Sequence, residues 1–231
     1  RFVFTMFGAG FAFEVMPLGG ILTVLAVLAI LTGSTVAIYQ DNIKRMLAYS
    51  SVAQIGYMIL GISFASVTGV TSGILHLFNH ALMKGGLFLA LGCVFYHLKG
   101  VRIEQFRGLG RVMPWTMAAI VLGGLSLVGV PLTVGFVSKW YLVLAALEQG
   151  AWHIALIVLV GSLLAVMYVW KLVEAAYFQA PAEGVTAREA PLQLLVPTWL
   201  LIGASIYFGI HTDLTVGVAT RAAETLFGAW Q

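Results

Sequence analysis

Charged side chains are scarce in this sequence. Only 9% of its 231 residues are Asp, Glu, Lys or Arg, whereas a soluble domain carries about 25%. Apolar residues make up 61%, and a surface so poor in charge would aggregate in water. The composition therefore excludes an ordinary soluble domain and favours a protein covered largely by lipid.

Cysteine is nearly absent as well. The single Cys93 lies in an apolar run, which excludes a disulfide framework, a cysteine zinc site and an iron–sulfur cluster. The 12 Lys and Arg residues form no basic stripe, so nucleic acid is not an expected partner. We expect no cofactor and see no redox or hydrolytic site. The chain begins at Arg1 without a signal-peptide pattern, and we interpret it as a fragment of a longer protein.

Long apolar runs dominate what is present. A membrane-spanning helix needs about 20 mostly apolar residues, and six runs qualify, so we predict an all-α, polytopic membrane protein. The predicted spans are 18–40, 46–66, 70–96, 114–147, 152–178 and 192–210. Together they form one transmembrane domain over 18–211.

Two terminal segments fall outside this domain. Residues 1–17 are apolar and contain glycine, which indicates the end of a preceding span followed by a loop. Residues 212–231 mix apolar side chains with Asp213, Arg221 and Glu224, which predicts a short interfacial helix.

Basic residues are unevenly divided between the two sides of the predicted bundle. The loops 41–45, 97–113 and 179–191 fall on one side and hold seven Lys and Arg residues, whereas the other side holds only Arg1 and Arg221. Cytoplasmic loops collect Lys and Arg. We therefore predict that these three loops are cytoplasmic and that the chain lies in the cell (plasma or inner) membrane.

The fourth predicted span is too long for one straight crossing. Its 34 residues would form a helix of about 51 Å, against a hydrocarbon core of about 30 Å. Gly129, Pro131 and Gly135 lie in its middle, where proline removes a backbone donor and glycine permits non-helical dihedral angles. We predict a discontinuous helix there, a feature that marks ion sites in transporters.

Three lysines fall inside predicted spans, where a charge costs about 2.5–3.5 kcal/mol. In the third span His76, His80 and Lys84 recur every four residues, so they share one helix face. Imidazole accepts and donates protons near neutral pH, and a lysine taken out of water releases its proton more readily. The pattern predicts a proton relay.

The other two lysines in predicted spans have different surroundings in the sequence. Lys139 follows the predicted break by four residues, and the unwound backbone would supply carbonyl groups and water to its ammonium, which favours a role in the relay. Lys171 has Glu174 at i+3. The sequence leaves two interpretations of them open, a local ion pair or a proton exit site.

The stripe in the third span has two alternatives. The histidines could bind neighbouring carbonyls while Lys84 pairs with an acid. Histidines at i and i+4 could instead chelate a metal, but no Asp, Glu or Cys on that stripe completes a ligand set.

Several motifs together resemble a known family. Residues 41–57 (DNIKRMLAYSSVAQIGY) are similar to the signature of the antiporter-like membrane subunits of respiratory complex I and Mrp-type cation/proton antiporters. Residues 76–84 (HLFNHALMK) resemble that family's histidine–lysine helix, and 129–141 (GVPLTVGFVSKWY) its broken helix, with Lys139 at the terminal charged position. Residues 168–178 (YVWKLVEAAYF) look most like the Mrp D subunit.

The resemblance implies a fold of fourteen helices in two inverted five-helix repeats, with charged residues along the membrane midplane. This chain would hold the last six helices, with Arg1 just after the eighth. The family's glutamate on the fifth helix and its lysines on the seventh and eighth have no counterpart here, and Lys139 stands where some members have a glutamate. The implied partners are other membrane subunits of a hetero-oligomeric assembly.

Two functional hypotheses remain open. The first is a proton-translocating subunit of a cation/proton antiporter that exchanges Na⁺ or K⁺. The second is a proton-pumping membrane subunit of a complex I-like NADH:quinone oxidoreductase or membrane-bound hydrogenase. A retinal protein is disfavoured by six spans without an intramembrane Asp counter-ion, and a purely structural bundle leaves three buried cations unexplained.

Overall fold

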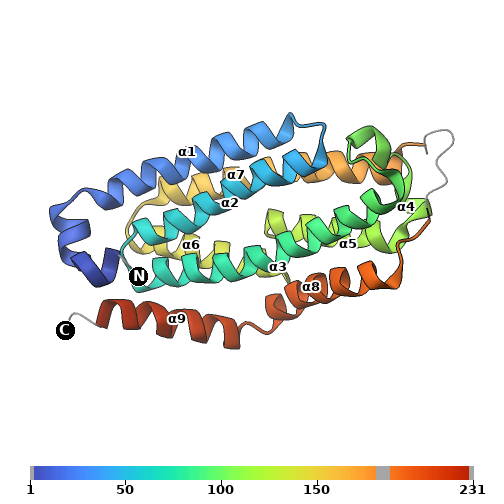
Figure 1. Cartoon of the computed structure of the whole chain (residues 1–231). Coiled ribbons are helices and arrows are strands. Elements are labelled where there is room, and N and C mark those ends of the chain that lie inside the picture. Colours follow the sequence, from blue (N-terminus) through green and yellow to red (C-terminus); the bar gives the residue numbers. More distant parts are fainter. Residues whose placement is uncertain (1–2, 181–187, 229–231) are drawn as a thin grey trace.

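The computed structural model describes residues 3–180 and 188–228, which form a bundle of long helices (Figure 1). Apart from one isolated bridge between Asn42 and Arg102, the described residues contain no β pairing. The long helices are α1 (Leu18–Ile38), α2 (Ile43–Ser63), α3 (Val67–Leu98), α5 (Pro114–Val128), α6 (Val134–Glu148), α7 (Trp152–Val173), α8 (Leu192–Ile210) and α9 (Asp213–Gly228). The short elements are η1 (Val3–Phe7), η2 (Phe11–Val15), η3 (Ile103–Phe106), α4 (Leu109–Val112) and η4 (Glu174–Phe178).

The bundle has the length and composition of a membrane domain. In the described part of the chain five helices are long and apolar enough to cross a membrane, namely α1, α2, α3, α7 with its η4 extension, and α8. The remaining prediction, the fourth span over 114–147, is the pair α5 and α6, two helices of 15 residues each. The predicted all-α class and its discontinuous helix are therefore confirmed.

Helix starts are set by side chains that accept free backbone N–H groups. The Asn42 side chain accepts from Arg45 N at 3.1 Å and begins α2, and Ser66 accepts from Gly69 N at 3.1 Å and begins α3. Such caps satisfy donors that a helix terminus leaves unpaired. Both helices start three residues before the predicted 46 and 70, because their caps lie upstream of the apolar runs on which the prediction was based.

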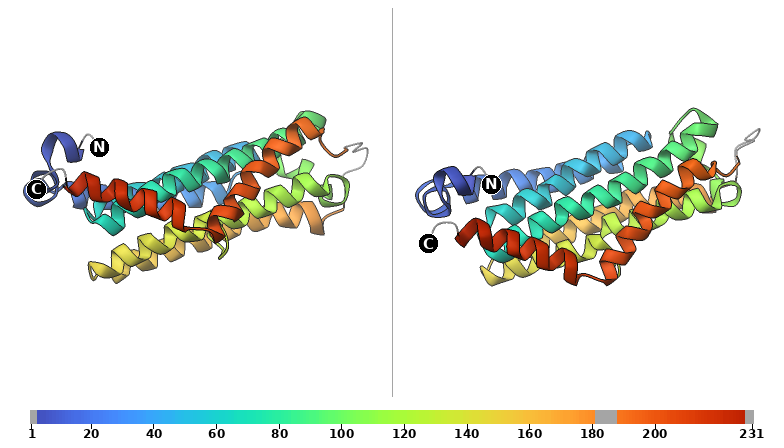
Figure 2. Two further views of the ribbon diagram at one scale, coloured as in Figure 1. Left: turned by 90° about the horizontal axis from the view of Figure 1, so that it is seen from below. Right: turned by 60° about the horizontal axis from the view of Figure 1, so that its bottom comes forward.

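Helix α3 is the centre of the bundle. It packs against α2, α5, α6, α8 and α9, and Figure 2 shows these helices side by side from two further directions. Buried apolar side chains such as Met83, Leu87 and Ala90 line its inner face. On the outside, α1 turns large apolar side chains outward, Val24 and Leu28 being more than half exposed, as expected of a surface that faces lipid.

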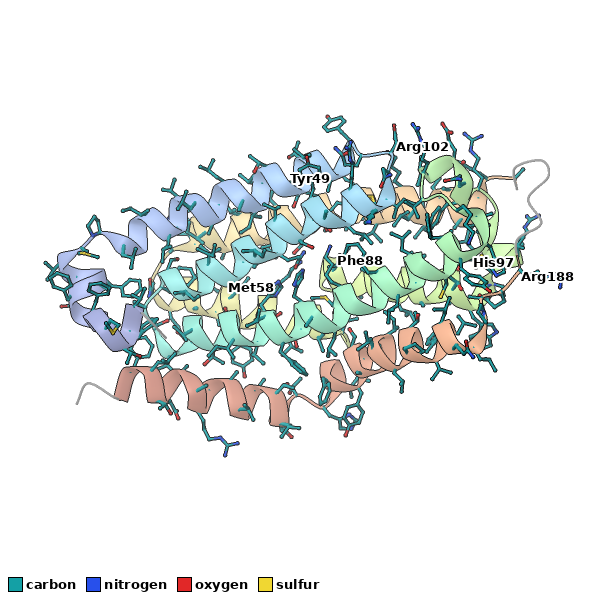
Figure 3. The ribbon with its side chains drawn as sticks, viewed as in Figure 1. Tyr49, Met58, Phe88, His97, Arg102 and Arg188 are labelled. Atoms are coloured by element: carbon teal, nitrogen blue, oxygen red, sulfur yellow. The ribbon has the colours of Figure 1, made fainter. Side chains whose placement is uncertain are left out.

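The three loops predicted to be cytoplasmic meet at one end of the bundle. Figure 3 shows His97, Arg102 and Arg188 at that end. Backbone hydrogen bonds from Ile43 N to Val101 O and from Ile103 N to Asp41 O, both 2.9 Å, join the first two loops. Residues 181–187 of the third loop lie outside the described residues, as does Arg1.

Both terminal segments are largely helical where the structure describes them. Among residues 3–17, η1 and η2 are short helical turns, and Phe4 packs with Val70 of α3 and Ala223 of α9. The described part of 212–231 is helix α9, which lies lengthwise along α3 after α8 (Figure 1). Its position at a membrane interface stays a prediction. The small side chains of Ala219 and Ala223 are buried and let α9 approach closely.

Candidate functional site

His76 joins three helices inside the bundle. The imidazole is buried, with Nδ1 2.8 Å from the Ser138 hydroxyl of α6 and Nε2 2.9 Å from the Gln54 oxygen of α2. An amide oxygen only accepts, so Nε2 carries a proton, and Nδ1 of the neutral ring accepts from Ser138. When neutral, the ring therefore has a donor side facing α2 and an acceptor side facing α6.

Lys84 lies two turns further along α3 and is only 6% exposed. Its ammonium donates to the Leu47 carbonyl at 2.6 Å and to the Ser50 hydroxyl of α2. Within residues 3–180 and 188–228, no carboxylate lies within 4.0 Å of it, so the alternative of an acid partner is wrong for this part of the chain. Among the described residues, its hydrogen-bond partners are both neutral oxygen atoms.

Lys139 is held at the helix break. The helix α5 ends at Val128, and Gly129 adopts a left-handed conformation with φ 90°. The ammonium donates to the Leu127 and Val128 carbonyls, both at 2.9 Å, and to the Ser162 hydroxyl of α7 at 3.0 Å. Carbonyls at a helix C-terminus lack intrahelical donors and form the negative end of the helix dipole. The break therefore creates a binding site for a cation.

Side chains of α2 connect the two lysines. Ser50, Gln54 and Tyr57 are spaced by four and three residues on one helix face. Ser50 binds Lys84, Gln54 binds His76, and the Tyr57 ring centroid lies 5.6 Å from the His76 ring and 4.8 Å from the Lys139 ammonium. All three are buried. They form a polar corridor that runs from Lys84 through His76 toward Lys139.

The sequence analysis did not single out these α2 residues as part of a relay. Their spacing was the available signal, because polar residues at i, i+4 and i+7 of an apolar helix share one buried face. Tyr168 of α7 is also buried, beside Ser50 and Gln54. No pattern in α7 alone indicates Tyr168.

His80 differs from His76. It is half-buried, and its Nε2 has no hydrogen-bond partner in residues 3–180 and 188–228. The two imidazole rings stack with centroids 6.5 Å apart. Asn79 between them donates to the Val134 carbonyl at 2.7 Å and so ties α3 to the start of α6. In the described part of the chain, no group of three or more His, Cys, Asp and Glu residues is arranged to hold a metal ion.

Lys171 and Glu174 are not paired with each other. Lys171 instead forms an ion pair of 2.9 Å with Asp41 and donates to the Gln40 carbonyl at 3.0 Å. The local pair, one of the two interpretations left open, is therefore not formed, and the proton exit site stays a hypothesis. The hydrogen bond and charge of Lys171 hold the pKa of the Asp41 carboxyl below its usual value of 3.8, and the charge of Arg102 acts in the same direction. Glu174 is exposed in η4. Lys171 therefore ties α7 to the loop between α1 and α2.

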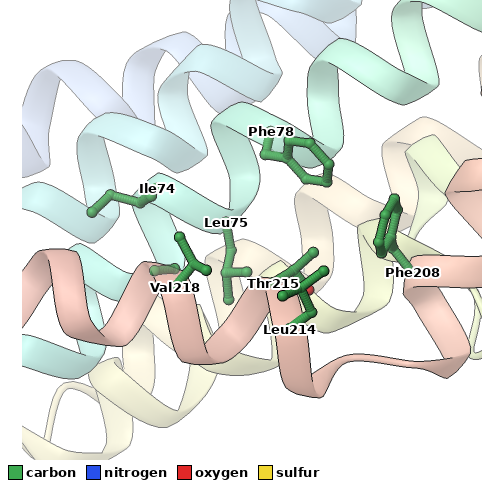
Figure 4. Close-up of a pocket in the computed structure, with 8 residues that line it drawn as sticks. Ile74, Leu75, Phe78, Phe208, Leu214, Thr215 and Val218 are labelled. Atoms are coloured by element: carbon green, nitrogen blue, oxygen red, sulfur yellow. The ribbon is translucent and has the colours of Figure 1, made fainter.

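Apolar grooves lie beside the corridor and away from it. A cavity of about 190 Å³ between α6 and α7 reaches Lys139 and Ser162 and is otherwise lined mainly by apolar side chains. A second, of about 300 Å³, lies between α3, α8 and α9, and Thr215 is its one polar lining residue (Figure 4). The second groove contains none of the predicted relay residues.

Comparisons with known proteins agree with this arrangement. The family described as "NADH:quinone oxidoreductase/Mrp antiporter, TM" matches residues 2–165. NADH-quinone oxidoreductase subunit N from Desulforudis audaxviator is 40% identical over 212 residues, which are 86% of this chain and 42% of that protein.

Two solved structures share the fold. One is the Mrp complex from Dietzia sp. DQ12-45-1b, with a TM-score of 0.84 and 25% identity over 90% of this chain and 47% of that chain. The other is the membrane-bound sulfane sulfur reductase, an archaeal respiratory membrane complex, with a TM-score of 0.82 and 32% identity over 91% and 43%. The chain thus spans less than half the length of these relatives.

Proposed function

Because this chain belongs to the NADH:quinone oxidoreductase/Mrp antiporter membrane-subunit family, we propose that it translocates protons as part of a multi-subunit ion-translocating complex. It is a multi-pass membrane protein, and its partners in the proposal are the other membrane subunits of that complex. The residues that move the proton are those of the polar corridor, with Lys84 and Lys139 as its ends.

The observation that carries the proposal is that two membrane-embedded ammonium groups lie along one stripe of buried polar side chains that includes His76. Lys84 binds Ser50, and His76 binds Gln54 on one side and Ser138 on the other. An ammonium that loses its proton to a neighbouring group becomes neutral, and a change in nearby charge returns the proton. Intramembrane ionisable residues that face the bundle interior mark such pathways.

Two kinds of complex remain candidates. A cation/proton antiporter is supported by the TM-score of 0.84 with the Mrp complex. A redox-driven complex is supported by 40% identity to a NADH-quinone oxidoreductase subunit. Both use the same proposed step in this chain, so the identity of the copurifying subunits, together with NADH- or Na⁺-dependent activity of the purified complex, distinguishes them.

The proposed step is tested in the complete complex in vesicles. We expect Lys84→Ala and Lys139→Ala each to lower proton flux, followed with a pH-sensitive dye, by at least about ten-fold, because each removes a proton-carrying group. The matched control is Lys44→Ala, at an exposed lysine outside the corridor, which should leave flux unchanged. Normal flux in both corridor variants, with normal assembly, contradicts the proposal.

A further inference from the structure

A polar cavity lies at the basic end of the bundle, away from the corridor. Its volume is about 340 Å³, and it is lined by Tyr39, Gln40, Asp41, Asn42, Arg45 and Arg102. The lining comes from the loop between α1 and α2, the first turn of α2 and the loop after α3. Two arginines therefore face one cavity from two different loops.

The charges around this cavity favour an anion. Asp41 is the one carboxylate of the lining, and it is already paired with Lys171 at 2.9 Å. Neither arginine has a carboxylate within 4.0 Å among residues 3–180 and 188–228. With Asp41 neutralised by Lys171, the two guanidinium groups leave the cavity with an excess of two positive charges.

The cavity is preorganised by the backbone. The antiparallel bridge between Asn42 and Arg102 and the bonds of Ile43 to Val101 and Ile103 to Asp41 fix the two loops against each other. The fixed backbone sets the points from which both arginines reach the cavity, and the planar donors of a guanidinium match phosphate oxygens in pairs.

The surface next to the cavity is apolar and exposed. Arg45, Tyr49 and Val52 are spaced by four and three residues, so they share a face of α2. Tyr49 is 41% and Val52 44% exposed. In Figure 3, Arg102 lies near the end of the bundle and Tyr49 lies further toward its middle. A ligand with a charged head in the cavity could therefore lay an apolar chain along α2.

We propose that this cavity binds the phosphate headgroup of an anionic phospholipid, whose acyl chain lies along Tyr49 and Val52 of α2. Basic pockets between membrane helices on the cytoplasmic side favour anionic headgroups, and the cavity combines such a pocket with an exposed apolar track. The site is separate from the corridor, so its test does not depend on proton flux.

The test measures lipid binding to the complete, delipidated protein by native mass spectrometry. The probes are phosphatidylglycerol and phosphatidylcholine with identical acyl chains. We expect the protein to prefer phosphatidylglycerol, and Arg45→Ala with Arg102→Ala to weaken that binding by about ten- to thirty-fold. Arg45→Lys with Arg102→Lys keeps the charge but loses the paired donors, so a smaller loss is expected.

The matched control is Arg107→Ala with Arg111→Ala, which removes the same charge from exposed residues outside the cavity. It should leave phosphatidylglycerol binding unchanged. Two outcomes would overturn the proposal. One is an equal loss of binding in the two double alanine variants, and the other is unchanged binding in both Arg45→Ala with Arg102→Ala and Arg45→Lys with Arg102→Lys. Displacement of phosphatidylglycerol by inorganic phosphate at equal concentration would also overturn it, since the site would then recognise a soluble anion.

Discussion

At the scale of single residues, the two buried lysines are stabilised in different ways. Lys84 binds a carbonyl within the continuous helix α2, where the Leu47 oxygen also accepts from Ser50 and Ser51 at 3.0 and 3.1 Å. Lys139 binds carbonyls that the end of α5 leaves free. The second arrangement supplies unshared acceptors, so the helix break stabilises a cation more directly than the intact helix does.

Gln54 is expected to be needed for proton transfer through His76. Gln54→Leu removes the acceptor that lies 2.9 Å from His76 Nε2 and leaves a buried N–H unpaired, at a cost of about 1–3 kcal/mol. We expect proton flux of the complete complex in vesicles to fall roughly ten-fold. Gln193→Leu is the matched control, because Gln193 is exposed in α8. Equal flux in the two variants would show that the Gln54 contact is only structural.

The Asp41–Lys171 ion pair predicts a pH dependence. Because Lys171 holds the pKa of Asp41 below 3.8, the stabilisation is fully present above pH 3.8 and is lost as the pH falls through the folded-state value. Asp41→Asn should therefore lower the melting temperature slightly at pH 7, and the difference should vanish on acidification below pH 3.8. Thermal unfolding in detergent, measured across this range, checks it. A difference that grows on acidification would contradict this assignment.

Sequence alone predicts which residues share a face of one helix, but not which neighbouring helix covers that face. His76, His80 and Lys84 form the expected stripe on α3, yet their burial differs because α2 and α6 cover only part of it. The partner of Lys171 lies 130 positions earlier in the chain, and the sequence prediction weighed only Glu174 nearby. Such long-range partners depend on helix packing, which no local pattern encodes.

At the scale of the elements, the break between α5 and α6 depends on close packing as well as on Pro131. The Cβ of an alanine at position 135 would overlap the Ser126 carbonyl oxygen of α5. The glycine therefore lets the first turn of α6 lie directly against the last turn of α5. This contact brings Lys139 within reach of the α5 carbonyl groups.

Gly135→Ala is expected to destabilise the protein by about 1–3 kcal/mol, because the two half-helices must move apart. The same shift takes Lys139 away from the Leu127 and Val128 carbonyls, so proton flux should fall too. Thermal unfolding in detergent and flux in vesicles measure the two effects.

Gly92→Ala provides the matched control within a helix. Gly92 lies in α3, and a Cβ there meets nothing within 4 Å. Alanine should stabilise this helix by about 0.5–1 kcal/mol. If Gly135→Ala were as well tolerated as Gly92→Ala, the close contact of α5 and α6 would not be required.

The break was predictable because the sequence marks it locally, with a span of excess length and Gly129, Pro131 and Gly135 at its centre. The position of α9 was not. Its mixture of charged and apolar residues predicts a helix with one apolar face, but the pattern did not indicate that this face packs against α3 with Ala219 and Ala223 buried. An amphipathic pattern indicates that a helix has an apolar face, but not whether lipid or another helix covers that face.

At the scale of the whole molecule, the two ends of the bundle differ in charge. Lys44, Arg45, Arg102 and Arg188 gather at the end where the first, third and fifth connections lie. The opposite end carries Glu148 and the turn before α7. The sequence was enough to assign each charged loop to one end of the bundle, because consecutive spans alternate in direction. It was not enough to predict which helices lie next to each other.

The orientation in the membrane follows from this asymmetry and can be measured. Cytoplasmic ends collect Lys and Arg, so Glu104 should face the cytoplasm and Glu148 the opposite side. We expect a membrane-impermeant maleimide to label Glu148→Cys in intact cells, and Glu104→Cys only after permeabilisation. Each variant is made in a cysteine-free form of the complete protein, which includes Cys93→Ala. Both residues are exposed, so burial does not account for a difference. Labelling of Glu104→Cys in intact cells would invert the orientation and place the proposed phospholipid site in the outer leaflet.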